Sequence, residues 1–274
     1  MSVLGHAVRS QPPPSGAAIT VDQPSTPAIA ASALRLTIGS VHIVDGIDLS
    51  VAPGEMLGVI GPNGAGKTTL FNLLSGVLRP TSGGVWLAGR DVTGLTATQR
   101  ARAGLGRTFQ TSSVFPGLSV GENVRLAAQA NRRGALSLVR RPRPDDEATQ
   151  FARARLADVG LEERAGTPAG QLAHGEKRKL EIALLLAGRP AVVLLDEPLA
   201  GVAMADVPAL VEVIRRLHLE QGRTVLMVEH HLDVILGLVD RVAVLHHGRL
   251  LACDRPDAVM ADPAVQRAYL GEPL

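Results

Sequence analysis

A glycine-rich segment near residue 60 carries residue types that bind phosphate. The segment GPNGAGKT, residues 61–68, lies between an apolar run and an apolar periodic stretch, the setting in which this spacing indicates strand, loop and helix. Its glycines allow backbone N–H groups to converge on phosphate oxygens at the positive end of the helix. Lys67 can bridge the β- and γ-phosphates, and the Thr68 hydroxyl can ligate Mg²⁺. The predicted nucleotide-binding residues here are Gly61, Pro62, Asn63, Gly64, Ala65, Gly66, Lys67, Thr68 and Thr69.

An acidic pair further along the chain supplies a second part of such a site. In VVLLDEP, four apolar residues predict a buried strand, and Asp196 and Glu197 follow at its carboxyl end, where open α/β sheets bind ligands. Asp196 would hold Mg²⁺, and Glu197 would orient and polarise an attacking water. The structural alternatives are a glycine-rich turn that only caps a helix and two acids that only end a strand. The combination of both motifs favours nucleotide hydrolysis.

The elements that must position these residues are strands and helices in alternation. Residues 33–60 alternate apolar and polar types between turn signals, which predicts antiparallel strands leading into a buried strand. Residues 111–189 have helical patterns, and from residue 190 strands and helices alternate again. We therefore predict an α/β fold: a P-loop NTPase core of mostly parallel sheet flanked by helices, with a small antiparallel β subdomain and an inserted helical subdomain.

The predicted organisation is one ATPase domain after a tail. Residues 31–272 would form the domain, with a catalytic core of residues 31–110 and 190–272 and a helical subdomain of residues 111–189. The proline-containing segments SQPPPSG and DQPSTPA predict a disordered tail over residues 1–30, without the apolar core of a signal peptide.

Composition excludes several classes of function. The 274 residues suffice for a large core, and the net charge of +2 gives no reason to expect a nucleic-acid partner. Cys253 is the single cysteine, which excludes an internal disulfide and a cysteine-rich zinc site and fits a reducing cytoplasm. No run approaches the roughly 18 apolar residues of a membrane span. A partner would therefore have to bring the chain to a membrane.

Five motifs in order resemble the ATP-binding subunits of ABC transporters over residues 31–272. They are the phosphate loop (residues 61–68), GRTFQ with Gln110, a signature loop at residues 172–176, LLDEP, and VLMVEH with His230. The resemblance implies a head-to-tail dimer that sandwiches two ATP molecules between the phosphate loop of one subunit and the signature loop of the other. Gln110 would contact Mg²⁺ or the attacking water and sense the membrane partner, and His230 would hydrogen-bond the γ-phosphate.

Within that family, the chain is similar to importer ATPases for branched-chain and other hydrophobic amino acids, a group that includes urea and short-amide systems. The stretches that carry this similarity are GLGRTFQTSSVFPGLSVGENV, LAHGEKRKLEI and AVQRAYLGEPL. The resemblance implies a homodimer or a heterodimer with a related ATPase subunit, two membrane permease subunits, and an extracytoplasmic solute-binding protein reached indirectly. It places the chain peripherally on the cytoplasmic face of the inner membrane. The alternatives are the same fold powering another process, such as lipopolysaccharide export, and a soluble cassette outside transport.

Two positions depart from the family pattern outside the signature loop. Ile38 stands where an aromatic residue usually stacks on adenine, which removes about 1 kcal/mol of stacking and predicts weaker or less base-selective ATP binding. Ala203 replaces an acidic or amide residue in the loop that crosses the dimer, which puts coupling between the two ATP sites in question. Asp206 is interpreted as a cap for the helix that follows.

The signature loop departs at three positions: the usual serine is Ala173, the usual glycine is His174 and the usual glutamine is Glu176. Ala173 cannot donate a hydroxyl hydrogen bond to the γ-phosphate, a loss of about 1.5 to 3 kcal/mol. Gly175, the backbone N–H groups and the helix N-terminus remain for phosphate binding, with His174 as an additional donor. The two cations after Glu176 are expected to offset its charge. Similar loops are familiar in amino-acid and urea importers, so the substitutions indicate a subfamily rather than inactivation.

Overall fold

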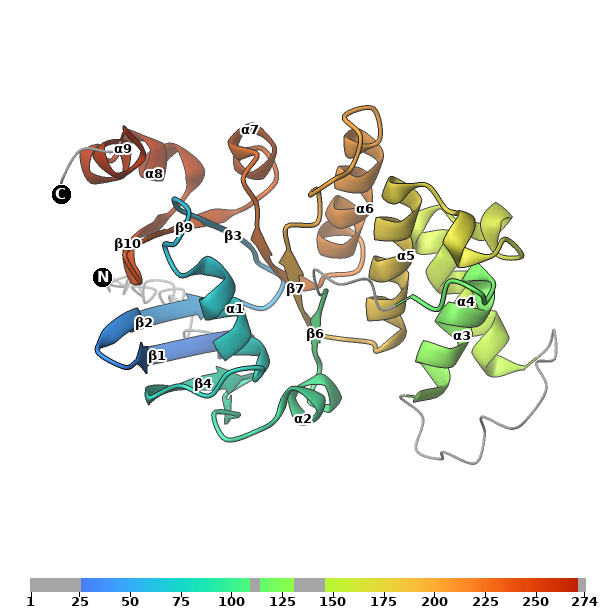
Figure 1. Cartoon of the computed structure of the whole chain (residues 1–274), viewed down its shortest axis with the longest axis horizontal. Helices are drawn as coiled ribbons and strands as arrows, with labels where there is room; N and C mark the ends of the chain where they lie inside the picture. The colour runs from blue at the N-terminus through green and yellow to red at the C-terminus, as the bar shows by residue number, and fades with distance from the viewer. Residues whose placement is uncertain (1–25, 109–113, 131–145, 271–274) are drawn as a thin grey trace, which may run out of the picture.

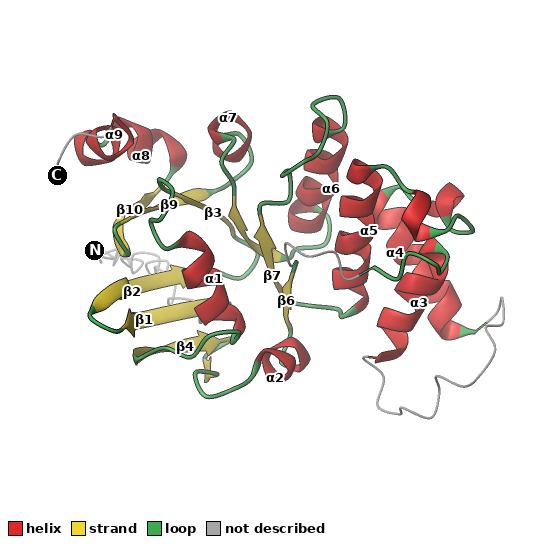
Figure 2. Cartoon of the chain, viewed as in Figure 1, coloured by secondary structure: helices red, strands yellow, loops and turns green. Residues whose placement is uncertain are grey.

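The computed structural model describes residues 26–108, 114–130 and 146–270. Two sheets lie at one end of the molecule, with α1 between them, and a group of helices extends from the other end (Figures 1 and 2). Among the described residues, no helix is long and apolar enough to cross a membrane. Gln110, which the sequence analysis assigned to the site, lies outside the described residues.

Within the described residues, the larger sheet has six strands in the order β10-β9-β3-β8-β7-β6. All neighbouring pairs are parallel except β10 with β9, which form an antiparallel hairpin. Every residue of the central strands β3, β7 and β8 is buried, which explains their uninterrupted apolar sequences. The strands are β3 (Met56–Ile60), β6 (Leu105–Arg107), β7 (Val192–Asp196), β8 (Thr224–Val228), β9 (Arg241–His246) and β10 (Arg249–Asp254).

The smaller sheet is antiparallel, with the order β2-β1-β4-β5. Its strands are β1 (Ile29–Ile38), β2 (Val41–Val51), β4 (Ser82–Leu87) and β5 (Arg90–Asp91). Strand β1 starts at Ile29, whose side chain is buried, so the last two residues of the segment predicted to be a tail belong to this sheet. The alternating pattern in β2 matches a sheet with one buried face.

Helix α1 (Lys67–Ser75) starts directly after the phosphate loop and is packed in the core shared by the two sheets. Arg100 of α2 (Ala97–Arg102) holds the other end of α1. Its guanidinium is fully buried and donates hydrogen bonds of 2.7 Å to the carbonyl oxygens of Leu73 and Leu74. These carbonyls belong to the last turn of α1, where the regular helical donors run out, so Arg100 stabilises the helix that positions the phosphate loop.

The described elements between residues 120 and 187 are helical, as the sequence predicted for this stretch. Helices α3, α4 and α5 pack against one another, and one apolar cluster continues from them through α6 into the large sheet. This continuity fixes the position of α5 relative to β7. The helices are α3 (Val120–Ala130), α4 (Glu147–Val159), α5 (His174–Ala187), α6 (Val207–Leu219), α7 (Leu232–Leu236), α8 (Pro256–Ala261) and α9 (Pro263–Leu270), with short 3₁₀ turns at Glu162–Arg164 and Ala169–Gln171.

Candidate functional site

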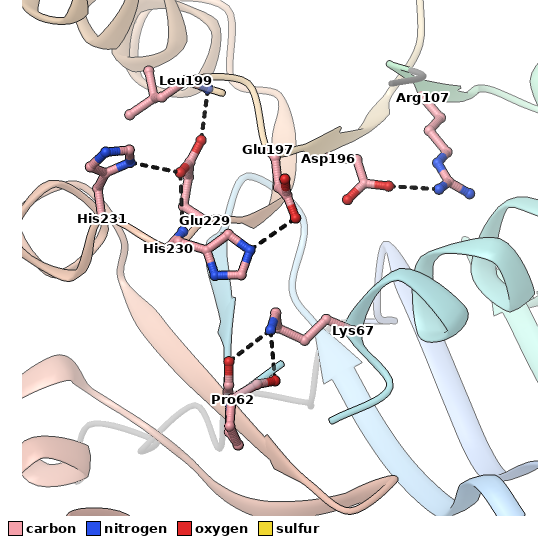
Figure 3. A network of polar contacts seen from close by, with 10 residues as sticks. Pro62, Lys67, Arg107, Asp196, Glu197, Leu199, Glu229, His230 and His231 are labelled. Carbon is pink, nitrogen blue, oxygen red and sulfur yellow. Dashed lines mark hydrogen bonds and ion pairs between the residues drawn. The ribbon is translucent and has the colours of Figure 1, made fainter. Parts of the chain in front are cut away.

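Three neighbouring parallel strands end at the candidate site. The phosphate loop follows β3, Asp196 is the last residue of β7 and Glu197 follows it, and Glu229 and His230 follow β8. Because the strands are parallel, their carboxyl ends meet at one edge of the sheet, as Figure 3 shows for the side chains drawn there. The fold therefore brings together residues that are more than 160 positions apart in the chain.

The phosphate loop has a backbone that only glycine can form at two points. Gly61 and Gly66 have φ angles of 153° and 100°. A Cβ at Gly61 would lie 2.2 Å from the Leu245 carbonyl oxygen, and one at Gly66 would lie 2.9 Å from that of Ile43. The loop is thus pressed against β9 and β2, which fixes its shape.

Lys67 reaches back over the phosphate loop. Its ammonium donates hydrogen bonds to the carbonyl oxygens of Gly61 (2.7 Å) and Pro62 (3.0 Å) (Figure 3). Burial lowers the pKa of the Lys67 ammonium, and nearby Glu197 opposes that shift. Thr68, the next residue, is exposed at the start of α1. A cation and a hydroxyl therefore stand at the N-terminus of a helix, an arrangement suited to phosphate.

Asp196 is buried beside Arg107, the last residue of β6. Its Oδ2 accepts a hydrogen bond of 2.8 Å from the Arg107 guanidinium, and the side chains are 1% and 6% exposed (Figure 3). The other oxygen, Oδ1, is buried and has no hydrogen-bond partner among the described residues. A buried carboxylate oxygen is normally paired, so this one is a candidate ligand for a cation or its water.

Glu197 and His230 form a pair across β7 and β8. Glu197 Oε1 lies 2.9 Å from His230 Nε2, and both side chains remain partly exposed (Figure 3). Glu197 has a φ of 48°, an unfavourable conformation for a residue with a side chain, which is held because its N–H donates to the Val228 carbonyl. The strained turn directs the carboxylate toward His230, so an acid and a base are in place for proton transfer.

Glu229 is a site residue that the sequence analysis missed. Its buried carboxylate accepts the Leu199 N–H at 2.7 Å and the His230 N–H at 3.1 Å, and it lies 3.3 Å from His231 Nδ1 (Figure 3). The carboxylate therefore joins the loop after Glu197 to the loop that carries His230. The only sequence signal was an acidic residue directly after an apolar strand.

The signature loop begins α5 without a side-chain cap at Ala173. Glu176 supplies the other half of a capping box from within the helix, because its carboxylate accepts the Ala173 N–H at 3.0 Å. The same carboxylate pairs with Arg164 at 2.9 Å. The hydrogen bond from Ala173, with the charge of Arg164, lowers the pKa of the Glu176 carboxyl. The sequence analysis expected Lys177 and the following arginine to offset this charge, and the structure adds an ion pair with Arg164.

The signature loop is braced by the residues that follow Glu197. A Cβ at Gly201 would lie 2.9 Å from the His174 ring, and one at Gly175 would lie 3.1 Å from the Asp206 side chain. Asp206 is the N-cap residue of α6, the position that the sequence analysis gave it, but its side chain makes no capping hydrogen bond. The carboxylate instead faces Gly175, and Ala203 is exposed in the loop between these contacts.

The fold does not bring the signature loop to the phosphate loop of the same chain. Helix α5 lies with the helical group, on the far side of β6 and β7 from α1 (Figure 1). Ala173 and His174 are exposed to solvent. The predicted nucleotide-binding residues therefore fall into two separate surfaces of one chain.

Ile38, the predicted adenine contact, lies at the tip of the β1–β2 hairpin. Its side chain is 63% exposed, and it pairs across the strands with Val41, which is 57% exposed. The two side chains form a small apolar surface near the β2 residues that touch Gly66. An aliphatic surface is in place for a base, without an aromatic ring.

Two family models match this chain. A model described as ABC transporter matches residues 44–200, and a model described as Branched-chain amino acid ATP-binding cassette transporter matches residues 249–273. The first covers the phosphate loop and the acidic pair of the site. The second covers β10 and the helices that follow it.

Curated relatives and solved structures agree with these matches. The chain is 37% identical over 253 residues, 90% of its length, to the high-affinity branched-chain amino acid transport ATP-binding protein LivG of Escherichia coli (strain K12). It is 37% identical over the same length to BraF of Pseudomonas aeruginosa, which has the same description, and each comparison covers 99% of the relative. A crystal structure of an ATP-binding cassette of an ABC transporter in its ADP conformation is 29% identical, with a TM-score of 0.79 over 90% of this chain and 99% of that one.

Proposed function

This chain belongs to the ATP-binding proteins of ABC transporters, and from that premise we propose that it powers import of branched-chain amino acids. Its fold is the ABC ATPase fold, a mostly parallel sheet with helices and an antiparallel β subdomain. The chain is thus an ABC transporter ATPase. The observation that carries the proposed chemistry is that the phosphate loop with Lys67, Glu197 and His230 all follow neighbouring parallel strands and lie at one edge of the sheet.

ATP would bind with its phosphates on residues 61–69 and its base on the apolar surface of Ile38 and Val41. The loop N–H groups and the Lys67 ammonium supply positive charge to the β- and γ-phosphates. Lys67 now donates to two loop carbonyls, bonds that it can exchange for phosphate oxygens. Because Ile38 has no aromatic ring to stack on the base, the contacts to the phosphates would supply most of the affinity for ATP.

The residues present fit Mg²⁺. Asp196 Oδ1 is buried without a partner in the described part of the chain, and a buried carboxylate oxygen in that state suits a hard cation. Thr68 and Asp196 would hold the ion, together with Gln110. When bound, Mg²⁺ would neutralise the negative charge that develops during phosphoryl transfer.

Glu197 would orient a water for in-line attack on the γ-phosphate and accept its proton. His230, 2.9 Å from Glu197 Oε1, would fix that carboxylate and donate a hydrogen bond to the γ-phosphate. The strained backbone at Glu197 supports this assignment, because unfavourable conformations are kept where they position a functional group.

We propose that a second ATP-binding subunit completes each ATP site. The separation of the signature loop from the phosphate loop, and the exposure of Ala173 and His174, support a head-to-tail dimer in which residues 173–176 face a partner's γ-phosphate. The partner is a second copy or a related ATPase subunit. Gly175, the N-terminus of α5 and His174 would supply donors in the absence of the usual serine.

The C-terminal family match and the names of the relatives support branched-chain amino acids as the solute. In that assembly the chain sits on the cytoplasmic face of the inner membrane against two permease subunits. An extracytoplasmic binding protein delivers the solute without touching this chain.

Glu197→Gln tests the chemistry. The amide cannot accept the proton of the attacking water, so we expect ATP turnover to fall by about a hundredfold or more while ATP binding persists. Turnover and binding of a fluorescent ATP analogue would be measured on the full chain. Glu212→Gln, an exposed change on α6, is the matched control and should behave as wild type. Persistent turnover in Glu197→Gln would remove this residue from its assigned role.

A further inference from the structure

We propose that Arg107 is a positioning residue for Asp196, which sets the orientation of the carboxylate for Mg²⁺. The inference rests on the proposed function, because it concerns the ion bound with ATP. The sequence motif GRTFQ pointed to Gln110 alone, yet its arginine makes the direct contact with the acidic pair. Arg107 Nη2 lies 2.8 Å from Asp196 Oδ2, and both side chains are buried.

The same guanidinium is fixed on its other side by α1. Arg107 Nη1 donates to Asn72 Oδ1 at 2.7 Å and to Ser75 Oγ at 2.8 Å. Its guanidinium carbon lies 6.0 Å from the centre of the Phe71 ring. One planar group therefore links the helix that follows the phosphate loop to the carboxylate at the end of β7.

The backbone of β6 adds a second hold on Asp196. Thr108, the residue after Arg107, donates its N–H to the Leu194 carbonyl and accepts the Asp196 N–H on its hydroxyl at 3.2 Å. The main-chain N–H of Asp196 therefore bonds to Thr108 and its carboxylate to Arg107, both at the end of β6. The carboxylate thus has one oxygen engaged by Arg107, while Oδ1 has no partner in the described residues.

This arrangement requires the shape of arginine as well as its charge. A guanidinium donates in several fixed directions at once, whereas an ammonium on a flexible stem acts as a point charge. Lysine at position 107 would keep the positive charge beside Asp196 but could not hold the same bonds to Asn72 and Ser75. The carboxylate would then lose its fixed orientation while its charge stayed balanced.

The test is Arg107→Lys in the full chain, with a fluorescent ATP analogue as the probe. Binding is measured in EDTA and across a Mg²⁺ titration, and ATP turnover is followed across the same titration. We expect unchanged binding of the analogue in EDTA. The Mg²⁺ concentration that gives half of the maximal turnover should rise by about tenfold or more, as for other residues that orient metal ligands. Arg241→Lys, whose ion pair with Glu55 lies at the opposite edge of the sheet, is the control and should match wild type.

A thermal melt distinguishes a role of Arg107 in the stability of the fold from a role in orienting Asp196. If Arg107→Lys melts earlier but keeps the wild-type Mg²⁺ midpoint, the proposal is overturned. Should that variant fail to fold, the double change Asn72→Ala with Ser75→Ala removes the α1 anchors and keeps the ion pair. We then expect a smaller rise in the same midpoint, and no rise would reject the proposal. Failure of the wild-type chain to bind the analogue would instead overturn the proposed function.

Discussion

At the scale of single residues, Glu229 controls the relative position of two loops. Its two carboxylate oxygens accept N–H groups from Leu199, two residues after Glu197, and from His230. Glutamine has nearly the same size but only one accepting oxygen. The substitution therefore removes an acceptor without opening a cavity.

For Glu229→Gln we expect turnover to fall by roughly ten- to a hundredfold, because small displacements of catalytic groups cost this much. One buried N–H loses its partner, which should also lower the free energy of unfolding by about 1 to 3 kcal/mol. Nucleotide affinity should stay close to wild type, since the residues of the phosphate loop are untouched. Steady-state turnover, analogue binding and denaturant unfolding would check these results. Wild-type turnover would show that Glu229 does not position His230.

At the scale of elements, Glu176 stabilises the N-terminus of α5, where Ala173 provides no side-chain cap. The carboxylate accepts the Ala173 N–H and pairs with Arg164 on a 3₁₀ turn. A negative charge in the first turn also suits the helix dipole. The residue that departs from the family pattern thus holds the signature loop in shape.

Glu176→Ala should lower the free energy of unfolding by about 0.3 to 1 kcal/mol at neutral pH. The pKa of Glu176 is lowered in the folded chain, so its contribution is fully present above the ordinary glutamate pKa of about 4.3. The contribution is lost as the pH falls through the lowered folded-state pKa. Denaturant unfolding of both proteins at pH 7 and in acid would measure this. A difference that grows in acid would contradict the sign.

At the scale of the whole molecule, the chain presents two incomplete surfaces. One carries the phosphate loop with Asp196 and Glu197, and the other carries residues 173–176 on α5. Contacts at Gly175 and Gly201 couple the second surface to the loop that follows Glu197. The signature loop and the loop that follows Glu197 are therefore packed against each other.

Sequence alone predicted the α/β class, because the apolar runs of β3, β7 and β8 and the helical stretches have distinct patterns. It also assigned Lys67 and Glu197 to the candidate site, because both lie in local motifs. Contacts between distant segments could not be predicted from the sequence. The contacts of Arg107 with Asp196 and of Glu229 with Leu199 depend on strand order and register. Local patterns report the elements, whereas strand order determines which polar groups meet.

The central claim is that this chain hydrolyses ATP in order to import branched-chain amino acids. The most direct test is ATP turnover by the copurified complex with its membrane subunits in proteoliposomes, with leucine-loaded or empty binding protein. We expect turnover that rises with leucine in the wild-type complex and is abolished by Glu197→Gln. ATP turnover that does not change with leucine, or that persists in the Glu197→Gln complex, would contradict the proposed function.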